Sequence, residues 1–168
     1  MYRNRKSGFT LVEILIVVII LGILAAIVIP QFTNASQDAR KSNLASQVQT
    51  LKSQIELYKL QHHDKAPDLI TSWDPFVFCS DDLGAKSTDA NPQLPSTTFP
   101  FGPYMQAKPQ NPLTGKETVV ATGSATTTDG WTFDASTGAI HGIAVDASNA
   151  AVETDDGVHD LTGTAITF

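Results

Sequence analysis

Hydrophobic and polar residues divide the chain into parts with different patterns. In residues 9–29 only Thr10 and Glu13 are polar, which predicts an apolar helix of about 31 Å, long enough to cross a bilayer. Beyond Pro30 apolar residues recur at steps of four and three, so the helix should continue to about His62 as an amphipathic segment. The predicted apolar stripe consists of Leu44, Val48, Leu51, Ile55 and Tyr58.

Residues 64–116 show neither a helical nor a strand period. Seven of the nine prolines lie between Pro75 and Pro112, and proline cannot join the interior of a helix or sheet. We therefore predict a long irregular connection for this part.

Residues 117–168 alternate with a period of two, which is typical of strands. Strands are predicted at residues 117–122, 131–133, 139–145 and 164–168. Residues 135–138 suit a hairpin turn. The predicted fold class is α+β, with a long N-terminal α-helix, apolar in its first half and amphipathic in its second, packed on a small C-terminal antiparallel β-sheet. The sheet face expected to cover the helix stripe contains Val119, Trp131, Ile140 and Ile143.

Glu13 is an acidic side chain inside the apolar segment. An acid near the middle of a membrane helix costs about 2.5–3.5 kcal/mol on insertion scales, so such residues are rare and are functional candidates. The spacing from Thr10 to Glu13 also fits a capping box, in which both side chains satisfy free amides at a helix start. The residues leave both roles open, a helix cap and a charge with a partner elsewhere.

The residues in front of the apolar segment end in a small residue, Gly8. Their basic members are Arg3, Arg5 and Lys6. A secretory signal peptide carries its small-residue cleavage site behind the apolar stretch, not in front of it. Cleavage after Gly8 would leave the apolar helix on the mature chain. Phe9 would then carry a cationic amine four residues from Glu13, on the same helix face.

The segment Lys6-Ser7-Gly8-Phe9-Thr10-Leu11-Val12-Glu13, followed by the apolar run, resembles the N-terminus of type IV pilin-like proteins. The resemblance implies that a membrane prepilin peptidase cleaves between Gly8 and Phe9 and then N-methylates Phe9. It also implies that Glu13 pairs with the N-terminal amine of a neighbouring subunit as a filament grows, which supplies the partner that a buried charge needs.

Gly22 and Pro30 match helix-breaking positions that subunits of this family carry. Pro30 has no amide to donate, so a kink or local melting is expected there. Membrane helices also tolerate such residues without any function. We favour a functional soft segment, because the resemblance adds to the local chemistry.

Cys79 is the single cysteine, which excludes an intrachain disulfide. Many type IV major pilins close a C-terminal loop with a disulfide, so its absence favours the pseudopilins of type II secretion. Residues 102–116 resemble the segment before the sheet in major pseudopilins, through Gly102-Pro103-Tyr104, Pro109 and Pro112. The resemblance implies a structural subunit of a filament that drives protein export. The alternative is the pilin of a surface pilus for adhesion, twitching or DNA uptake.

Taken together, the patterns predict a leader (residues 1–8), a membrane and filament-core helix (9–30), its amphipathic continuation (31–63), the irregular region (64–116) and the sheet region (117–168). The basic leader places the N-terminus in the cytoplasm and the rest in the periplasm, as a single-pass protein of the bacterial inner membrane. Assembly would then build a periplasmic or cell-surface filament.

The expected partners are further copies of the chain, the prepilin peptidase, minor pseudopilins and the inner-membrane platform of the secretion system. Removal of the leader leaves 8 of the 11 basic residues against 17 acidic ones, a net side-chain charge of −9. Such a charge argues against nucleic-acid binding.

Five acids gather in residues 146–160 without a Lys or Arg. Carboxylates in a Gly-containing loop suit Ca²⁺, and major pseudopilins hold calcium in a C-terminal loop. The resemblance therefore implies calcium, with Asp155, Asp156 and Asp160 as candidate ligands. The spacing is not that of an EF-hand, and solvated acidic loops are common, so a loop without metal stays open.

Other candidate groups favour structural roles. His62 and His63 point to different helix faces, which predicts a polar helix end, and Cys79 lacks a His at any informative spacing. The sequence contains no recognisable catalytic set, so no enzyme activity is predicted. The rival from another class is a membrane-anchored periplasmic binding protein, which would need neither Glu13 nor the Gly8-Phe9 junction.

Overall fold

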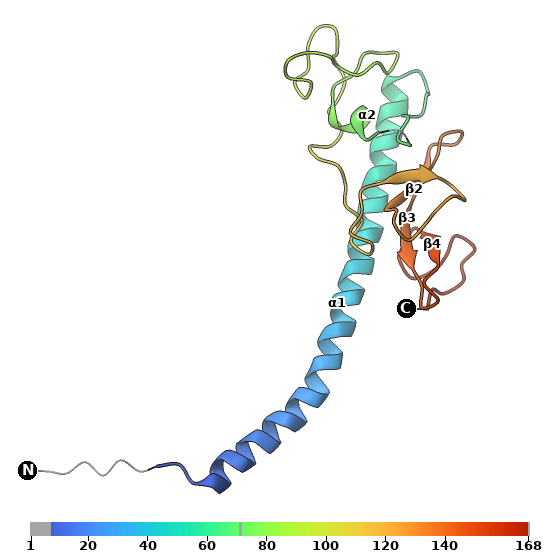
Figure 1. Cartoon of the computed structure of the whole chain (residues 1–168). Helices are drawn as coiled ribbons and strands as arrows, with labels where there is room; N and C mark the ends of the chain where they lie inside the picture. Colours follow the sequence, from blue (N-terminus) through green and yellow to red (C-terminus); the bar gives the residue numbers. More distant parts are fainter. Residues whose placement is uncertain (1–7, 71, 168) are drawn as a thin grey trace, which may run out of the picture. The chain divides into compact units, whose positions relative to one another are not determined.

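The computed structural model describes residues 8–70 and 72–167 and combines a long helix with a small sheet (Figure 1). The chain forms two compact units, residues 1–39 and 40–168, and helix α1 (Leu11–Gln61) contributes to both. The α+β prediction is confirmed. The predicted leader lies outside the described residues except for Gly8, as does the last residue, Phe168.

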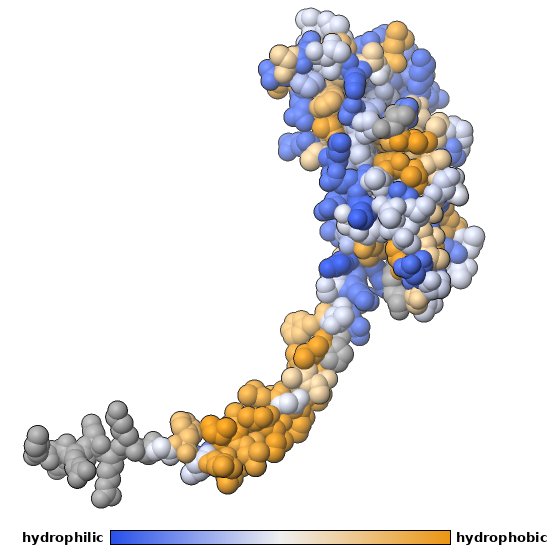
Figure 2. All heavy atoms as spheres, viewed as in Figure 1, coloured by the Kyte–Doolittle hydropathy of each residue, from blue (hydrophilic) through white to orange (hydrophobic). Residues whose placement is uncertain are grey.

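The first unit contains the apolar half of α1. Its large apolar side chains, from Phe9 to Phe32, are exposed, and hydrophobic atoms cover this part of the surface in Figure 2. Among the described residues, α1 is the one helix long and apolar enough to cross a membrane, and no part of its apolar window is buried. The helix runs through Gly22 and Pro30 without interruption, so their role as soft points stays a prediction.

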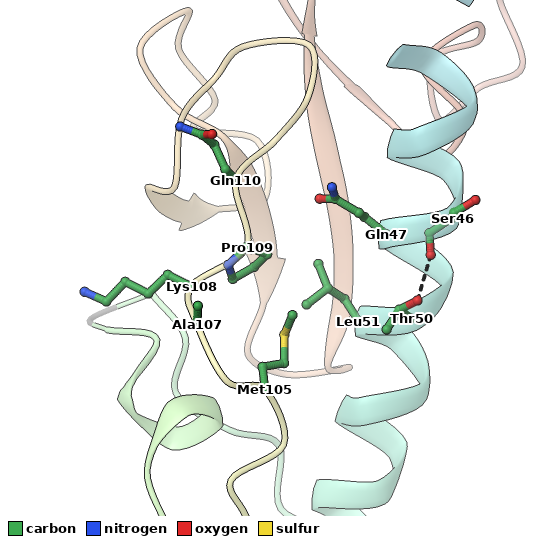
Figure 3. A pocket seen from close by; sticks show the side chains of 9 residues that line it. All are labelled: Ser46, Gln47, Thr50, Leu51, Met105, Ala107, Lys108, Pro109 and Gln110. Carbon is green, nitrogen blue, oxygen red and sulfur yellow. Dashed lines mark hydrogen bonds between the residues drawn. The ribbon is translucent and has the colours of Figure 1, made fainter. Parts of the chain in front are cut away.

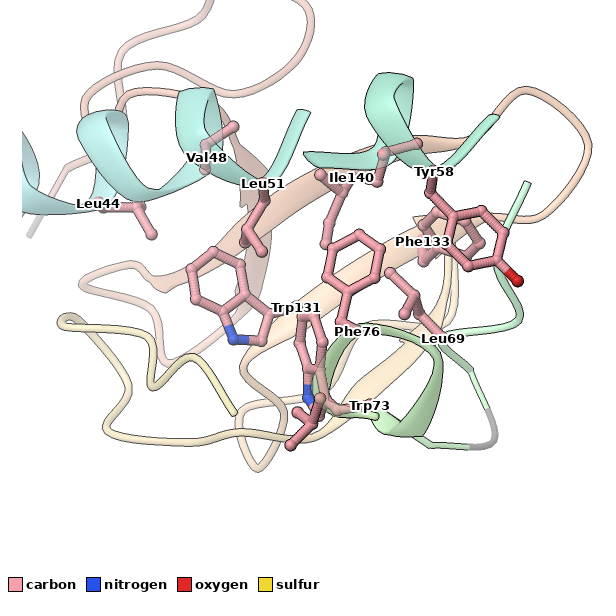
Figure 4. Packing of buried hydrophobic residues seen from close by; sticks show 12 residues of the cluster. Leu44, Val48, Leu51, Tyr58, Leu69, Trp73, Phe76, Trp131, Phe133 and Ile140 are labelled. Atoms are coloured by element: carbon pink, nitrogen blue, oxygen red, sulfur yellow. The ribbon is translucent and has the colours of Figure 1, made fainter. Parts of the chain in front are cut away.

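In the second unit, α1 presents its apolar stripe to the core, as predicted. Figure 4 shows the buried side chains that surround it, among them Trp131, Phe133 and Ile140 of the sheet. The stripe residues, all nearly or fully buried, are Leu44, Val48, Leu51, Ile55 and Tyr58. Because burying a Leu or Ile side chain is worth about 1.5–3 kcal/mol, the stripe determines which helix face docks.

The sheet has four strands in the order β1 (Val119–Ala121), β2 (Trp131–Asp134), β3 (Ala139–Val145) and β4 (Ala151–Thr154). Strands β2 and β3 form the predicted antiparallel hairpin, in which Gly138 N donates to Asp134 O at 2.7 Å. Gly138 has a φ of 76°, a conformation that glycine adopts readily.

The sheet is mixed, so the prediction of a fully antiparallel sheet is wrong. Strand β1 pairs with β2 in parallel, with Val119 opposite Trp131. Residues 122–130 bring the chain back to the start of β1, where the amides of Gly130 and Trp131 both donate to Thr118 O. A hairpin turn would have produced an antiparallel pair, whereas this longer return places β2 in the same direction as β1.

The predicted strand at residues 164–168 is also wrong for the part that the structure describes. Ala165 makes only an isolated bridge with His159. The fourth strand is instead β4, which pairs antiparallel with β3. Its sequence, Ala-Val-Glu-Thr, has too few apolar residues to show a period, so only the pairing with β3 reveals it.

The segment between helix and sheet is fastened to the core at several points. The single-turn helix α2 (Asp74–Val77) places Phe76 in the core. Trp73 Nε1 donates to Glu117 O at 2.6 Å. The buried amide of Asn111 donates to Gly130 O at 2.6 Å and to Ile143 O at 2.9 Å. These bonds satisfy carbonyls in β3 and next to the starts of β1 and β2, and they hold the irregular segment against the sheet.

Candidate functional site

The junction between Gly8 and Phe9 lies immediately before α1. The Phe9 side chain is 85% exposed. Apart from its chain neighbours, no heavy atom of residues 8–70 or 72–167 lies within 4 Å of the position that a side chain on Gly8 would occupy. The peptide bond between these residues is therefore open to an enzyme.

Glu13 closes a capping box at the start of α1. Its Oε2 accepts hydrogen bonds from Thr10 N and from Thr10 Oγ1, each at 2.8 Å, and Glu13 N donates to Thr10 Oγ1 at 3.2 Å. The predicted cap is confirmed. These bonds use one carboxylate oxygen and do not involve the amine of Phe9. The predicted pairing with a neighbouring subunit involves a second molecule and stays a prediction.

Asp155, the first candidate calcium ligand, is engaged by two donors from other elements. Lys52 Nζ lies 2.7 Å from Asp155 Oδ2, and His141 Nδ1 lies 2.7 Å from Asp155 Oδ1. Burial by itself would raise the pKa of Asp155, but the hydrogen bonds from Lys52 and His141 outweigh it, so the pKa is lowered. The Asp155 carboxylate therefore forms an ion pair with Lys52 of α1 and contacts His141 of β3.

Asp156 and Asp160 organise the loop in which they lie. Asp156 Oδ1 accepts from the amides of Val158 and His159 at 2.7 and 2.8 Å, and Asp156 Oδ2 lies 2.9 Å from His159 Nδ1. Asp160 Oδ1 accepts from the amide of Thr162 at 2.9 Å and from that of Thr164 at 2.8 Å. Both carboxylates are thus acceptors for donors of their own loop.

These three carboxylates do not fit a calcium ion. Calcium takes about six to eight oxygen ligands around one point, whereas each of the three is engaged by its own set of protein donors. Within residues 8–70 and 72–167, no group of three or more His, Cys, Asp or Glu side chains is placed to hold a metal. Calcium binding at Asp155, Asp156 and Asp160 stays a prediction.

A groove of about 360 Å³ lies between the second half of α1 and residues 105–110 (Figure 3). Leu51, Met105 and Pro109 supply apolar surface, and Gln47 Oε1 is buried there without a hydrogen-bond partner among the described residues. Lys108 is the one titratable side chain among the residues that line it. The residues that line the groove are apolar or uncharged except for Lys108, as is common in protein–protein contact surfaces, and they include no acid–base pair.

The paired histidines and the cysteine are partly as expected. His62 directly follows α1 and contacts a carbonyl of its last turn, with Nδ1 at 2.8 Å from Tyr58 O, as suits the predicted polar helix end. It is nevertheless fully buried, stacked on Tyr58, with Nε2 at 2.9 Å from Ser80 Oγ, and this burial was not predicted. His63 is exposed. Cys79 is buried, which raises the pKa of its thiol and favours the unreactive form.

Sequence reasoning missed Lys52, His141 and Asn111. Lys52 lies outside the predicted apolar stripe, and it is 103 positions from Asp155 in the chain. The hydrophobic period contains no signal for a polar contact over that distance. Asn111 directly precedes Pro112 and lies two residues after Pro109, a context that indicates a turn and not a buried amide.

Comparison with known proteins adds a family signal at the N-terminus. The model of the prokaryotic N-terminal methylation motif matches residues 3–29. The type II secretion system core protein G of Klebsiella michiganensis is 28% identical over 125 residues, 73% of this chain and 79% of the relative. The protein of that name from Vibrio cholerae is 26% identical over 133 residues, 79% of this chain and 82% of the relative.

A shorter alignment shows a higher sequence identity. The type II secretion system core protein G of Pseudomonas aeruginosa is 40% identical over 62 residues, 37% of this chain and 44% of the relative. No solved structure matches this chain.

Proposed function

We propose that this chain is a type IV pilin-like protein and a structural subunit of a filament, the major pseudopilin of a type II secretion system. One observation carries the proposal. The methylation motif coincides with an exposed Gly8-Phe9 junction in front of an uncovered apolar helix, with Glu13 in its first turn. The similarity to proteins named core protein G over most of the chain selects the secretion branch of the family.

The proposed assembly begins with processing in the inner membrane. The prepilin peptidase cleaves after Gly8 and N-methylates Phe9, and the apolar half of α1 stays on the mature subunit. An incoming subunit brings its Phe9 amine to Glu13 of a neighbour. In a water-poor environment an unpaired charge is strongly unfavourable, so this pairing selects one offset between packed helices. Uniform hydrophobic packing alone does not select an offset.

The proposed topology follows from the basic leader. Arg3, Arg5 and Lys6 keep the N-terminus in the cytoplasm, and the second unit lies in the periplasm. Minor pseudopilins and the inner-membrane platform are the proposed partners in assembly. The role is structural and we expect no catalytic activity. The relatives carry the name of a secretion-system component, and the groove beside α1 contains no acid–base pair.

Intact-mass analysis of the protein extracted from membranes tests the processing step. We expect a mature chain that begins at Phe9 with a methylated amine. Gly8→Leu is the control, because a large residue at the cleavage position should leave the leader attached. A mature chain that begins at Met1, or beyond Pro30, would contradict the proposal.

A surface pilus is the second candidate within the family, and deletion of the gene separates the two. If the chain is a pseudopilin, exported proteins should disappear from the culture supernatant while adhesion and twitching persist. The opposite result would identify a pilin. The buried single Cys79 favours the first outcome, because it excludes the intrachain disulfide that closes the C-terminal loop in many pilins.

A further inference from the structure

The C-terminal loop, residues 155–160, is tied to two other elements by one carboxylate. Lys52 of α1 and His141 of β3 reach different oxygens of Asp155, each at 2.7 Å. The side chains are 36%, 15% and 45% exposed for Lys52, His141 and Asp155. Since both oxygens already accept a protein donor, the negative charge of Asp155 is balanced by the chain itself.

The rest of the loop is arranged around this contact. Thr154, fully buried at the end of β4, donates from Oγ1 to Asp156 Oδ1 at 3.1 Å and accepts from Gly157 N at 2.9 Å. Gly157 has a φ of 71°, and a side chain there would lie 3.3 Å from Lys41 Cα on α1. The loop backbone therefore lies directly against the helix, within reach of the Lys52 ammonium group.

We propose that Lys52, His141 and Asp155 form a clamp that holds the C-terminal loop on α1 and β3 without a bound divalent cation. The Lys52 ammonium supplies the positive charge that a metal ion would otherwise bring to the Asp155 carboxylate. Asp156 and Asp160 bind donors of their own loop and present no shared site for an ion. The clamp is intramolecular and does not depend on the proposed function.

The experiment uses the full chain in detergent micelles, with two measurements, thermal unfolding and amide hydrogen exchange of residues 151–160. We expect the melting temperature of the unmodified protein to be the same in chelator and in added calcium. Lys52→Met should lower it by about 2–4 °C, because partly exposed ion pairs contribute little globally. The same variant should increase exchange in residues 151–160, since the loop loses its contact with α1.

Two further variants make the test specific. Lys52→Arg keeps the charge and should retain slow exchange in the loop. Lys65→Met removes an exposed lysine away from the loop and should change neither measurement. If Lys52→Met does not fold, Asp155→Asn removes the charge at nearly the same volume and should show the same increase in exchange.

Two results would overturn the proposal. The first is a melting temperature that falls in chelator and is restored by calcium, which would make Asp155, Asp156 and Asp160 metal ligands. The second is wild-type exchange of residues 151–160 in both Lys52→Met and Asp155→Asn, which would show that the loop is held by other contacts.

Discussion

Glu13 has a local partner in the single chain and, in our proposal, a distant one in the filament. The capping box with Thr10 uses Oε2 and needs no second molecule. The proposed pairing with a Phe9 amine needs the carboxylate charge and not the cap. Substitutions at the two ends of the box therefore separate the roles.

At the residue scale, we expect Glu13→Val to insert into the membrane and to be cleaved after Gly8, because the leader is intact and an acidic group leaves the span. Filament assembly should fail, since an incoming amine would be buried without a counter-charge. Thr10→Val is the matched control, because it removes the two capping bonds of the Thr10 hydroxyl and keeps the Glu13 carboxylate, and it should assemble. Pelleting and electron microscopy of filaments provide the measurement. If Glu13→Val forms filaments at the wild-type yield, the proposed pairing is wrong and Glu13 acts only as a helix cap.

At the element scale, the amphipathic half of α1 is held in place by its apolar stripe, which packs into the core. Leu51 is fully buried in the core, whereas Leu60, on the same helix, is 83% exposed. The two residues share their chemistry and their element and differ in what covers them. Their comparison measures what the docked face contributes to stability.

Leu51→Ala should lower the free energy of unfolding by about 2–5 kcal/mol, because it removes buried methyl groups and leaves a cavity. Leu60→Ala should change it by less than about 0.5 kcal/mol, as expected for an exposed position. Urea unfolding of both variants in micelles checks the difference. Equal effects of the two substitutions would contradict the docking of this stripe on the sheet.

At the scale of the whole molecule, the two units differ in what they need from their surroundings. The first exposes apolar side chains almost throughout, while the second encloses a core built from α1, α2 and the sheet. A surface like that of the first unit requires lipid or other subunits. The core of the second unit is already covered within the chain.

Residues 31–168 should therefore fold as a soluble monomer, whereas the chain from Phe9 onward should require detergent. Light scattering after size exclusion reports the mass, and circular dichroism reports the secondary structure. A fragment that aggregates or stays unfolded would show that the second unit depends on the apolar half of the helix.

Much of the fold could be predicted from the sequence because its signals are local. The 3.6-residue helical period identifies α1 and its stripe, the spacing from Thr10 to Glu13 identifies the cap, and the run of residues 131–145 identifies the hairpin of β2 and β3. Each depends only on residues within a few positions of one another. Covalent geometry alone determines which of their side chains share a face.

Only the tertiary structure decided the remaining features. Three such features are the parallel direction of β1, the burial of His62 and the contact of Lys52 with Asp155. Each depends on contacts between parts of the chain that short motifs do not connect. These contacts form only where a loop brings two distant segments together, and the path of each loop is determined by many weak packing contacts acting together. No period along the chain records their combined effect, so the clamp on the C-terminal loop becomes visible only when helix and sheet are placed together.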